Sequence, residues 1–390
     1  MKSNFFLFLL FFASLVACQN EKASQLSKAK NLQLEIVDSL RVDYIGNLSF
    51  MDVQPDLQRV LFFDIQKRAF VVTDFEGNRL GEFVKEQDSP DGFGTFPMGA
   101  GRLLEGDRVQ VVSMFGVFEY DFEGNLFQSA KTPDEEIKSF AGRIDAQREI
   151  YPVEDKLLMT GLVARGEYNK TQPEFYDEFE QLVWIDPKTG SMEQFLLLDS
   201  ASLFQNGQSH EPGTLSATFE VIDDQLYVIN GGEPVLTIYE LAAPYQKIKR
   251  VTLDLTDFQV NEGEDPQKAD PNAISFDPSY GIISKMVRAG DLLIISYTTG
   301  YDDLDREEYQ SVNSQQSFRD FNERIAGKYK SRIQIMNLDG EKVADFEFPE
   351  KLGNTFVSRD GALWFNALPN PEVEEDFFQL YRVEIKESQE

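Results

Sequence analysis

From Leu32 onward, short apolar runs of four to eight residues alternate with polar turn segments along the chain. The runs are rich in Val, Ile, Phe and Tyr, and the three-to-four-residue spacing of amphipathic helices is nearly absent. This pattern indicates a many-stranded antiparallel protein. Val109–Val112 and Leu292–Ile295 are continuous or nearly continuous apolar runs, as expected of strands that are buried on both faces.

A repeated turn sets the unit of the fold. Asp74–Asn78 reads DFEGN, and the same five residues return as Asp121–Asn125, 47 positions later. A spacing in this range corresponds to one blade of a propeller. In each copy we expect the Asp to cap a turn between two strands and the Gly to accept a positive φ.

Grouping the predicted strands in fours gives five complete blades and a sixth with three strands. The strands expected in the first three blades are Leu48–Val53, Val60–Asp64, Ala69–Asp74 and Arg79–Val84; Gly101–Leu104, Arg108–Ser113, Val117–Asp121 and Leu126–Ala130; Glu149–Val153, Lys156–Leu162, Leu182–Asp186 and Met192–Leu198. Those expected in the last three are Ala217–Ile222, Gln225–Asn230, Val235–Leu241 and Lys247–Leu255; Gly281–Val287, Asp291–Tyr297, Arg332–Asn337 and Lys342–Phe348; Thr355–Ser358, Ala362–Asn366 and Phe378–Ile385.

The missing strand of the sixth blade is available at the other end of the chain. Leu32–Leu40 is a strand-like run that precedes the first blade, and pairing it beside Phe378–Ile385 would remove an exposed sheet edge. The sequence therefore predicts an all-β fold: one six-bladed β-propeller domain of four-stranded antiparallel blades over residues 32–386, closed by the N-terminal strand.

Long connections are predicted on one face of this propeller only. Turns from strand one to two and from three to four are short, whereas the other set contains every long segment: Lys85–Pro97, Lys131–Arg148, Val163–Gln181, Asp199–Ser216, Thr256–Tyr280 and Thr298–Ser331. Random insertion would spread length over both faces. We therefore expect a recognition surface at one mouth of the central channel, although tolerated insertions would leave the same pattern.

The long loops carry the candidate ligand-binding residues. Aromatic side chains there can stack on sugar rings or anchor peptides, or can simply pack the loops down. A short helix is expected at Phe318–Ile325, and the acids before it suit either a ligand or a solvated helix start. The candidates are Tyr168, Tyr176, His210, Tyr280, Tyr301, Asp302 and Asp303, with Phe175, Tyr297 and Tyr309 as aromatic neighbours.

The inventory of reactive side chains narrows the chemistry. His210 is the only histidine, which excludes multi-histidine zinc sites. There is no phosphate loop, nucleophile elbow or calcium-loop spacing, so no cofactor and no metal site is predicted. Carboxylates remain as catalytic candidates, and Glu167, Glu211, Asp302 and Asp303 are those expected near the mouth.

Composition and charge fit a large core under an acidic surface. Hydrophobic residues make up 42% of the 390 residues and include 33 Phe, enough for a sizeable core. The 67 acidic and 37 basic residues give a formal net charge of −30. Such a surface repels nucleic acid, so no nucleic-acid partner is expected.

The first residues read as an export signal. Lys2 is followed by the apolar run Phe5–Val16, which is too short to span a membrane, and then by Leu15-Val16-Ala17-Cys18. This quartet resembles a bacterial lipobox, in which the Cys thiol is lipidated. Residues 1–17 are then the signal peptide, Cys18 the lipidation site and 18–31 a flexible tether. Gln19 after the Cys favours the outer membrane, by resemblance to sorted lipoproteins.

Taken together, these features resemble a family of six-bladed, TolB-like propeller lipoproteins of Bacteroidetes, of unknown function. The resemblance rests on the lipobox at Cys18, on Glu82-Phe83 leading to Ser89–Gly94, on the Asp-x-x-Gly turns and on the closing run Phe377–Ile385 after the acidic segment 372–376. It implies a fold and a location in the cell envelope, and it supplies no catalytic residues.

Two hypotheses for function remain open. The first is an outer-membrane, lipid-anchored module that binds a glycan, a peptide or an envelope protein with its long-loop face and has no enzymatic activity. The alternative is an envelope hydrolase or lyase that acts on saccharides with carboxylates at the channel mouth. Two converging carboxyls, one with a raised pKa, would favour the enzyme.

Overall fold

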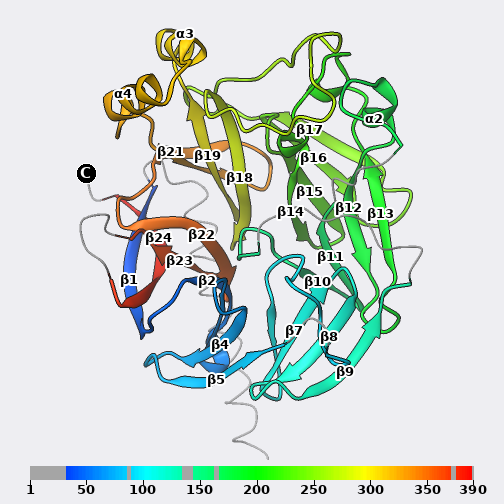
Figure 1. The fold of residues 1–390 in the computed structure, drawn as a ribbon, viewed down its shortest axis with the longest axis vertical. Helices are drawn as coiled ribbons and strands as arrows, with labels where there is room; N and C mark the ends of the chain where they lie inside the picture. Colours follow the sequence, from blue (N-terminus) through cyan, green and yellow to red (C-terminus); the bar gives the residue numbers. More distant parts are fainter. Residues whose placement is uncertain (1–31, 86–88, 134–143, 162–166, 370–374, 389–390) are drawn as a thin grey trace, which may run out of the picture.

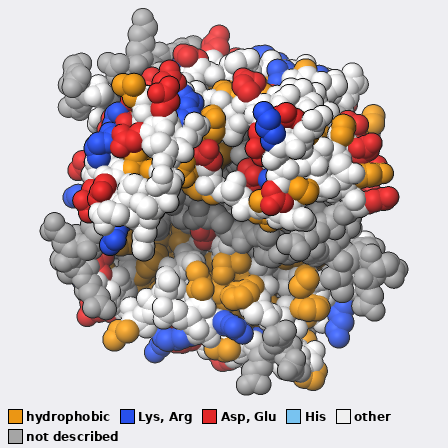
Figure 2. Space-filling model, turned by 45° about the horizontal axis from the view of Figure 1, so that its top comes forward, with side chains coloured by type: hydrophobic (Ala, Val, Ile, Leu, Met, Phe, Trp, Pro, Cys, Tyr) orange, Lys and Arg blue, Asp and Glu red, His pale blue; other side chains and the backbone are white. Residues whose placement is uncertain are grey.

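The computed structural model describes residues 32–85, 89–133, 144–161, 167–369 and 375–388. Six antiparallel sheets of four strands surround a central axis, so the predicted six-bladed β-propeller is confirmed (Figure 1). From the axis outward five sheets follow chain order, and the sixth has the order β22-β23-β24-β1, with the N-terminal strand outermost. The face shown in Figure 2 is hollowed near its centre, as expected of a ring of blades.

The strands lie close to the predicted ranges. Blades one to three contain β2 (Leu48–Gln54), β3 (Arg59–Asp64), β4 (Ala69–Asp74) and β5 (Arg79–Val84); β6 (Arg102–Leu104), β7 (Arg108–Ser113), β8 (Gly116–Asp121) and β9 (Leu126–Lys131); β10 (Tyr151–Val153), β11 (Lys156–Thr160), β12 (Glu180–Ile185) and β13 (Met192–Leu197). Blades four to six contain β14 (Ala217–Ile222), β15 (Gln225–Asn230), β16 (Val235–Glu240) and β17 (Lys247–Thr252); β18 (Tyr280–Ala289), β19 (Leu292–Gly300), β20 (Arg332–Asn337) and β21 (Lys342–Glu347); β22 (Leu352–Arg359), β23 (Ala362–Ala367), β24 (Phe377–Glu387) and β1 (Leu32–Asp43).

The N-terminal strand closes the ring. β1 pairs antiparallel with β24 from Leu32 opposite Glu387 to Asp43 opposite Phe377. Leu32, Leu40 and Val42 of β1 are buried in the core. The two ends of the described chain therefore lie in the same blade, and β24, which would otherwise form an open edge, is covered.

The third blade departs from prediction at its inner strand. We predicted a strand from Glu149, but β10 begins at Tyr151. The preceding backbone is engaged elsewhere: the Ala146 amide donates to the Phe50 carbonyl oxygen at 2.9 Å, and the Arg148 carbonyl accepts from the Ala100 amide at 2.9 Å. These bonds to blades one and two replace the ladder, and they draw residues 146–149 toward the channel.

The repeated DFEGN segments form the predicted turns. Asp74 Oδ1 accepts hydrogen bonds from the amides of Glu76 at 3.0 Å and Asn78 at 2.8 Å, and Asp121 makes the same bonds in blade two. Gly77 has φ +82°, and an added Cβ would lie 2.1 Å from the Arg41 carbonyl oxygen. Only glycine fits this turn, because both the backbone angle and the approach of β1 exclude a side chain.

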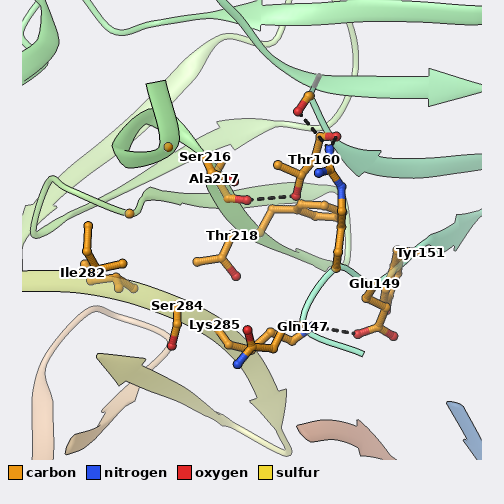
Figure 3. Close-up of a pocket in the computed structure, with 16 residues that line it drawn as sticks. Gln147, Glu149, Tyr151, Thr160, Ser216, Ala217, Thr218, Ile282, Ser284 and Lys285 are labelled. Atoms are coloured by element: carbon orange, nitrogen blue, oxygen red, sulfur yellow. Dashed lines mark hydrogen bonds and ion pairs between the residues drawn. The ribbon is translucent and has the colours of Figure 1, made fainter. Parts of the chain in front are cut away.

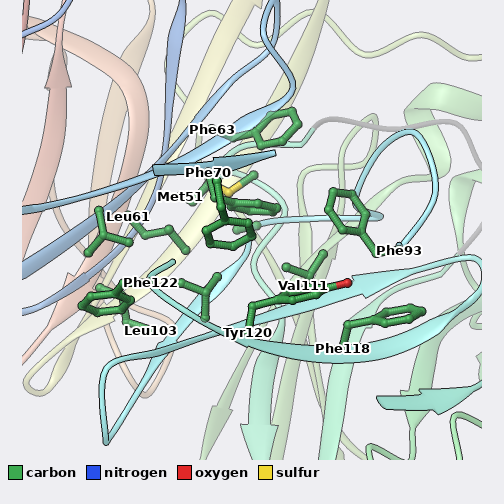
Figure 4. Packing of buried hydrophobic residues seen from close by; sticks show 14 residues of the cluster. Met51, Leu61, Phe63, Phe70, Phe93, Leu103, Val111, Phe118, Tyr120 and Phe122 are labelled. Atoms are coloured by element: carbon green, nitrogen blue, oxygen red, sulfur yellow. The ribbon is translucent and has the colours of Figure 1, made fainter. Parts of the chain in front are cut away.

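The core lies between neighbouring blades. Figure 4 shows the cluster between blades one and two, where aromatic rings interlock. Phe70 packs against Phe63, Phe83 and Phe93, with ring centroids 5.0, 5.3 and 5.6 Å apart. Each such side chain contributes roughly 1.5–3 kcal/mol on burial. Packing of this kind repeats around the ring and fixes the inner strands about the channel.

Helices occur in the long connections. α2 (Pro173–Asp177) lies in the connection between β11 and β12, and α3 (Asp303–Ser311) and α4 (Gln315–Ile325) form a hairpin between β19 and β20 (Figure 1). The helix predicted at 318–325 is confirmed as part of α4. Asp302 caps α3 by accepting from the Asp305 amide at 3.0 Å, so the acidic segment is a helix start. Within the described part of the chain, every helix is too short or too polar to span a bilayer.

Candidate functional site

A cavity of about 330 Å³ opens at the channel between blades three, four and five. Its walls come from the ends of inner strands that border the long connections, and we call it the mouth cavity. The ten residues labelled in Figure 3 include hydroxyl-bearing side chains and, at the lower side of the view, Glu149 and Lys285. The lining of the mouth cavity includes Arg148, Glu149, Tyr151, Thr160, Gly213, Ser216, Thr218, Ser284 and Lys285.

The hydroxyl groups of the mouth cavity are held by the blades. Thr160 Oγ1 donates to the Ala217 carbonyl oxygen at 2.9 Å, which links blades three and four. Thr218 Oγ1 accepts from the Met286 amide at 2.8 Å, which links blades four and five. Ser284 Oγ lies 2.8 Å from Ser296 Oγ. These hydroxyls are thus fixed in position, and their remaining hydrogen-bonding capacity is available to a polar ligand.

Six ionisable side chains, one from each blade, meet in the channel. We call them the channel ring. They are Asp52 of β2, Arg102 of β6, Glu149 just before β10, Glu220 of β14, Lys285 of β18 and Arg359 of β22. Because Glu149 and Lys285 also line the mouth cavity, part of the ring forms its wall.

Ion pairs cross the channel within this ring. Arg359 contacts Asp52 of the adjacent blade at 2.8 Å and Glu149 of the opposite blade at 2.7 Å. Lys285 Nζ lies 3.3 Å from Glu149 and donates to the Ala146 carbonyl oxygen at 3.0 Å. Burial alone would raise the pKa of Glu149, but the charges of Arg359 and Lys285 outweigh it and hold that pKa at about 2.

Glu220 is the uncharged member of the ring. Its side chain is buried and makes no ion pair with any described residue. Burial, with the negative charge of Glu149 adding to it, raises the pKa of Glu220 to about 8. Burial likewise raises the pKa of Tyr151, which is influenced by both glutamates. Of the two glutamates in the channel, Glu149 is therefore ionised and Glu220 protonated at neutral pH.

A smaller side pocket of about 110 Å³ adjoins the mouth cavity, and Gly213 and Ile282 line both. Its lining includes Phe204, Tyr280 and the exposed Phe276, with the carboxylates of Glu211 and Asp277. Glu211 is already engaged, because it pairs with the buried Lys170 and accepts from the Ser275 amide at 2.9 Å. The side pocket is thus mainly an aromatic extension of the mouth cavity.

Tyr176 and His210, predicted as ligand-binding residues, lie together inside the loops. The Tyr176 hydroxyl donates to the Lys170 carbonyl oxygen at 2.7 Å and accepts from the His210 amide at 2.7 Å. The His210 ring packs edge-on against Tyr176 and Phe204. Burial lowers the pKa of His210 to about 4. Both side chains therefore hold two long loops in one unit, and neither lines the mouth cavity or the side pocket.

Tyr301, Asp302 and Asp303 belong to the helical hairpin. Tyr301 is buried against Tyr309, Phe321 and Tyr329. Asp302 pairs with Lys328 at 2.7 Å, in addition to capping α3. Asp303 pairs with Arg306, whose guanidinium lies 5.4 Å from the ring centre of Tyr280. Tyr280 is thus the one predicted binding residue that lines a described pocket.

The remaining predicted residues take no part in these pockets. Tyr168 is half-buried and Glu167 is exposed in the connection between β11 and β12, and neither lines the mouth cavity or the side pocket. Cys18, the predicted signal peptide and the predicted tether lie outside the described residues.

The sequence analysis did not predict the channel ring, although the inner strands contain a signal for it. Each of the first five inner strands predicted above contains a single acidic or basic residue: Asp52, Arg102, Glu149, Glu220 or Lys285. Arg359 directly follows the sixth. A buried strand rarely carries a charge without a partner, so one charge in every inner strand indicates a shared cluster. The predicted binding residues lie in the loops instead, because loops usually carry function.

Comparison with known proteins places the fold and leaves the function open. No protein-family model matches the chain, and no curated protein sequence matches it. A solved member of the DUF4221 family from Bacteroides vulgatus is similar over 92% of this chain and 100% of that one, with a TM-score of 0.67 and 11% identity. A PQQ-bound aldose sugar dehydrogenase from Streptomyces coelicolor covers 92% of this chain and 99% of its own, with 12% identity and a TM-score of 0.46. BamB from Moraxella catarrhalis is similar over 90% of this chain and 100% of its own length, with 10% identity and a TM-score of 0.38. At 11% identity the likeness to the DUF4221 member shows the fold alone, and nothing about function follows from these three structures.

Proposed function

We propose that the protein is an exported, lipid-anchored β-propeller that binds a ligand at the long-loop mouth of its channel. The ligand is a glycan, a peptide or a segment of an envelope protein, and binding rather than catalysis is the main activity. The observation that carries the proposal is the mouth cavity itself: its lining combines apolar side chains with fixed hydroxyl groups, and it lies on the face that bears all the long connections.

The loops beside the cavity support binding because they are preorganised. The buried Lys170 pairs with Glu211, which also accepts from the Ser275 amide, so three connections meet at one carboxylate. Ser209 and Glu264 exchange backbone hydrogen bonds at 2.8 and 2.9 Å. We call these connections, between β11 and β12, β13 and β14, and β17 and β18, the rim. A rim fixed in this way loses little conformational entropy when a ligand binds.

The anchor and the location rest on the sequence. The apolar run and Cys18 resemble a lipoprotein signal, Gln19 favours the outer membrane, and the resemblance to TolB-like propeller lipoproteins agrees with both. Replacing the lipidated residue, Cys18→Ser, should abolish incorporation of a radioactive fatty acid in the native host. Unchanged labelling of the variant would refute the anchor.

The binding proposal is tested with a pair of variants at Gly213. An added Cβ at this residue meets no atom within 4 Å, and the residue lines both pockets. Gly213→Trp should therefore fill the mouth without unfolding the blade, whereas Gly213→Ala should leave it open. Thermal melting of the purified proteins is followed with panels of oligosaccharides and peptides, since a ligand at a hundred times its Kd adds about 2.7 kcal/mol of stability.

A melting shift seen in the wild type and in Gly213→Ala but lost in Gly213→Trp supports binding at the mouth. The same shift in all three proteins would place the ligand elsewhere and refute the proposal.

The second candidate function is a saccharide hydrolase or lyase. It is favoured by one observation, the pairing in the channel of ionised Glu149 with protonated Glu220, because carbohydrate-active enzymes often need one carboxyl of each kind. Any saccharide that shifts the melting temperature should be tested for turnover. Product formation that is lost in both Glu149→Gln and Glu220→Gln would establish the enzyme.

A further inference from the structure

The channel ring reverses the charge of the molecule. The whole chain carries −30, but the ring contains three cations, Arg102, Lys285 and Arg359, against two ionised carboxylates, Asp52 and Glu149. Glu220 is buried without an ion pair to a described residue, and a carboxyl in that position stays protonated. The ring therefore has an excess of one positive charge (3 − 2 = +1).

The excess positive charge comes from the ring itself and does not depend on a single exposed side chain. Arg359 is fully used by Asp52 and Glu149, whereas Arg102 donates at 2.8 Å to the neutral amide oxygen of Gln110 and forms no ion pair with a described residue. Arg148 also lines the mouth cavity and donates to the carbonyl oxygens of Thr160 and Gly161, and the count is reached without it.

A positive charge enclosed by protein walls acts strongly on a ligand that enters the cavity. Little water separates the ring from the cavity, so the field of the ring is screened less there than at the surface. Lys285 is the ring cation that lines the cavity, and its ammonium group makes two contacts with described residues, one to Glu149 and one to the Ala146 carbonyl oxygen. An ammonium group has three protons, so one further hydrogen bond is available.

The rest of the cavity favours a ligand rich in hydroxyl groups. Thr160, Ser216, Thr218, Ser284 and Tyr151 present hydroxyls in a volume of about 330 Å³, at the lower end of the range for small-ligand sites. The adjoining side pocket offers the ring of Tyr280 for stacking. A sugar has hydroxyl groups that suit these side chains, and its apolar ring faces suit Tyr280 and the apolar wall that Phe219, Ile282 and Ile283 form.

We infer that the ligand of the mouth cavity is an acidic sugar, a saccharide with one uronic acid carboxylate seated toward Lys285 of the channel ring. The inference rests on the proposed function, since it names the ligand class of the same site. The single positive excess of the ring matches one carboxylate, and the fixed hydroxyls match the sugar.

The test compares an acid with its uncharged ester. Digalacturonic acid and its methyl-esterified form have the same ring and differ in charge, and isothermal titration of the purified protein measures both. We expect the acid to bind roughly tenfold or more tightly than the ester, as one charged hydrogen bond accounts for such a ratio. Lys285→Met should reduce the affinity for the acid to that for the ester, and Lys285→Arg should retain the difference.

Lys285→Gln provides a second variant if Lys285→Met does not fold. It removes the positive charge and keeps a hydrogen-bond donor, so it should also lose the preference for the acid over the ester.

The outcomes separate this inference from the proposed function. Equal affinity for acid and ester would overturn the acidic-sugar inference, and so would a shift in melting temperature with peptides alone. In either case, loss of binding in Gly213→Trp would still support the mouth as the site. Binding of the acid that persists in Gly213→Trp would instead overturn the mouth site, and with it both proposals.

Discussion

The rim loops and the channel solve the problem of burying polar groups in opposite ways. In the rim, aromatic side chains such as Tyr176 and His210 pack together and satisfy backbone groups of the loops. In the channel, regular strands bring charged side chains together, and Arg359 joins opposite blades. The difference teaches that residue type and loop position are a poor guide here, because the aromatic residues hold the loops together and the strands supply the charges that line the channel.

The two regions should therefore respond differently to substitution. A change in the rim removes neutral hydrogen bonds and packing and should affect stability alone. A change in the channel ring leaves a charge without its partner, so it should affect stability, its dependence on pH and the affinity for an anion. Three variants test this comparison.

The largest effect is expected for Arg359→Met. The substitution removes the cation that serves both Asp52 and Glu149 and leaves two carboxylates in the channel with reduced compensation. Breaking a buried ion pair from one side should lower the free energy of unfolding by about 3 kcal/mol. Urea denaturation at neutral pH measures it. The matched control is Lys188→Met, which breaks an exposed pair with Asp155 and should change little. Equal effects of the two substitutions would contradict a special role for the ring.

The next effect is a change in pH dependence for Glu220→Gln. In the wild type the folded state keeps a proton on Glu220 up to about pH 8, whereas the unfolded carboxyl releases it near its ordinary pKa of 4.5. The stability from this group is therefore fully present below about pH 4.5 and is lost as the pH rises to 8. Glutamine stays neutral, so melting temperatures from pH 5 to pH 9 should fall less steeply in the variant, by a few degrees over the range. Parallel curves for the two proteins would show that Glu220 is ionised in the fold.

The smallest effect is expected in the rim, for Tyr176→Phe. The variant leaves the Lys170 carbonyl and the His210 amide without the hydroxyl that joins them, at a cost of about 1 kcal/mol. Binding at the mouth should be unchanged. Tyr280→Phe is the matched control, because its hydroxyl makes no hydrogen bond to a described residue and its loss should not lower stability. A large loss of ligand affinity in Tyr176→Phe would mean that the rim also binds.

Local patterns were sufficient to predict the blades. Apolar runs and turn residues predicted the bounds of β4, β5, β7, β14, β15 and β20 to the residue. Strands such as β4 and β7 are nearly continuously apolar because they are buried between neighbouring blades. The DFEGN turns and the pairing of β1 with β24 followed from equally local signals. The start of β10 did not, since Ala146 and Arg148 bond to other blades and no nearby residue reveals it.

The candidate site was less predictable for the same physical reason. The sequence placed Tyr280 near the mouth, but it could not show that Tyr176, His210 and Tyr301 turn inward, because burial of a loop side chain depends on which other loops cover it. Nor could it show that Glu149 would face Arg359 across the channel while Glu220 would remain without a cation.

The sequence by itself determined the number of blades, their antiparallel order, the closing strand and the face that bears the long connections, since each follows from periodicity and turn residues close together in the chain. Only the tertiary structure decided which carboxyls are ionised and where the mouth cavity lies. Residues 52, 149, 220, 285 and 359 are far apart in sequence, and they interact because closure of the ring brings the inner strands to one axis.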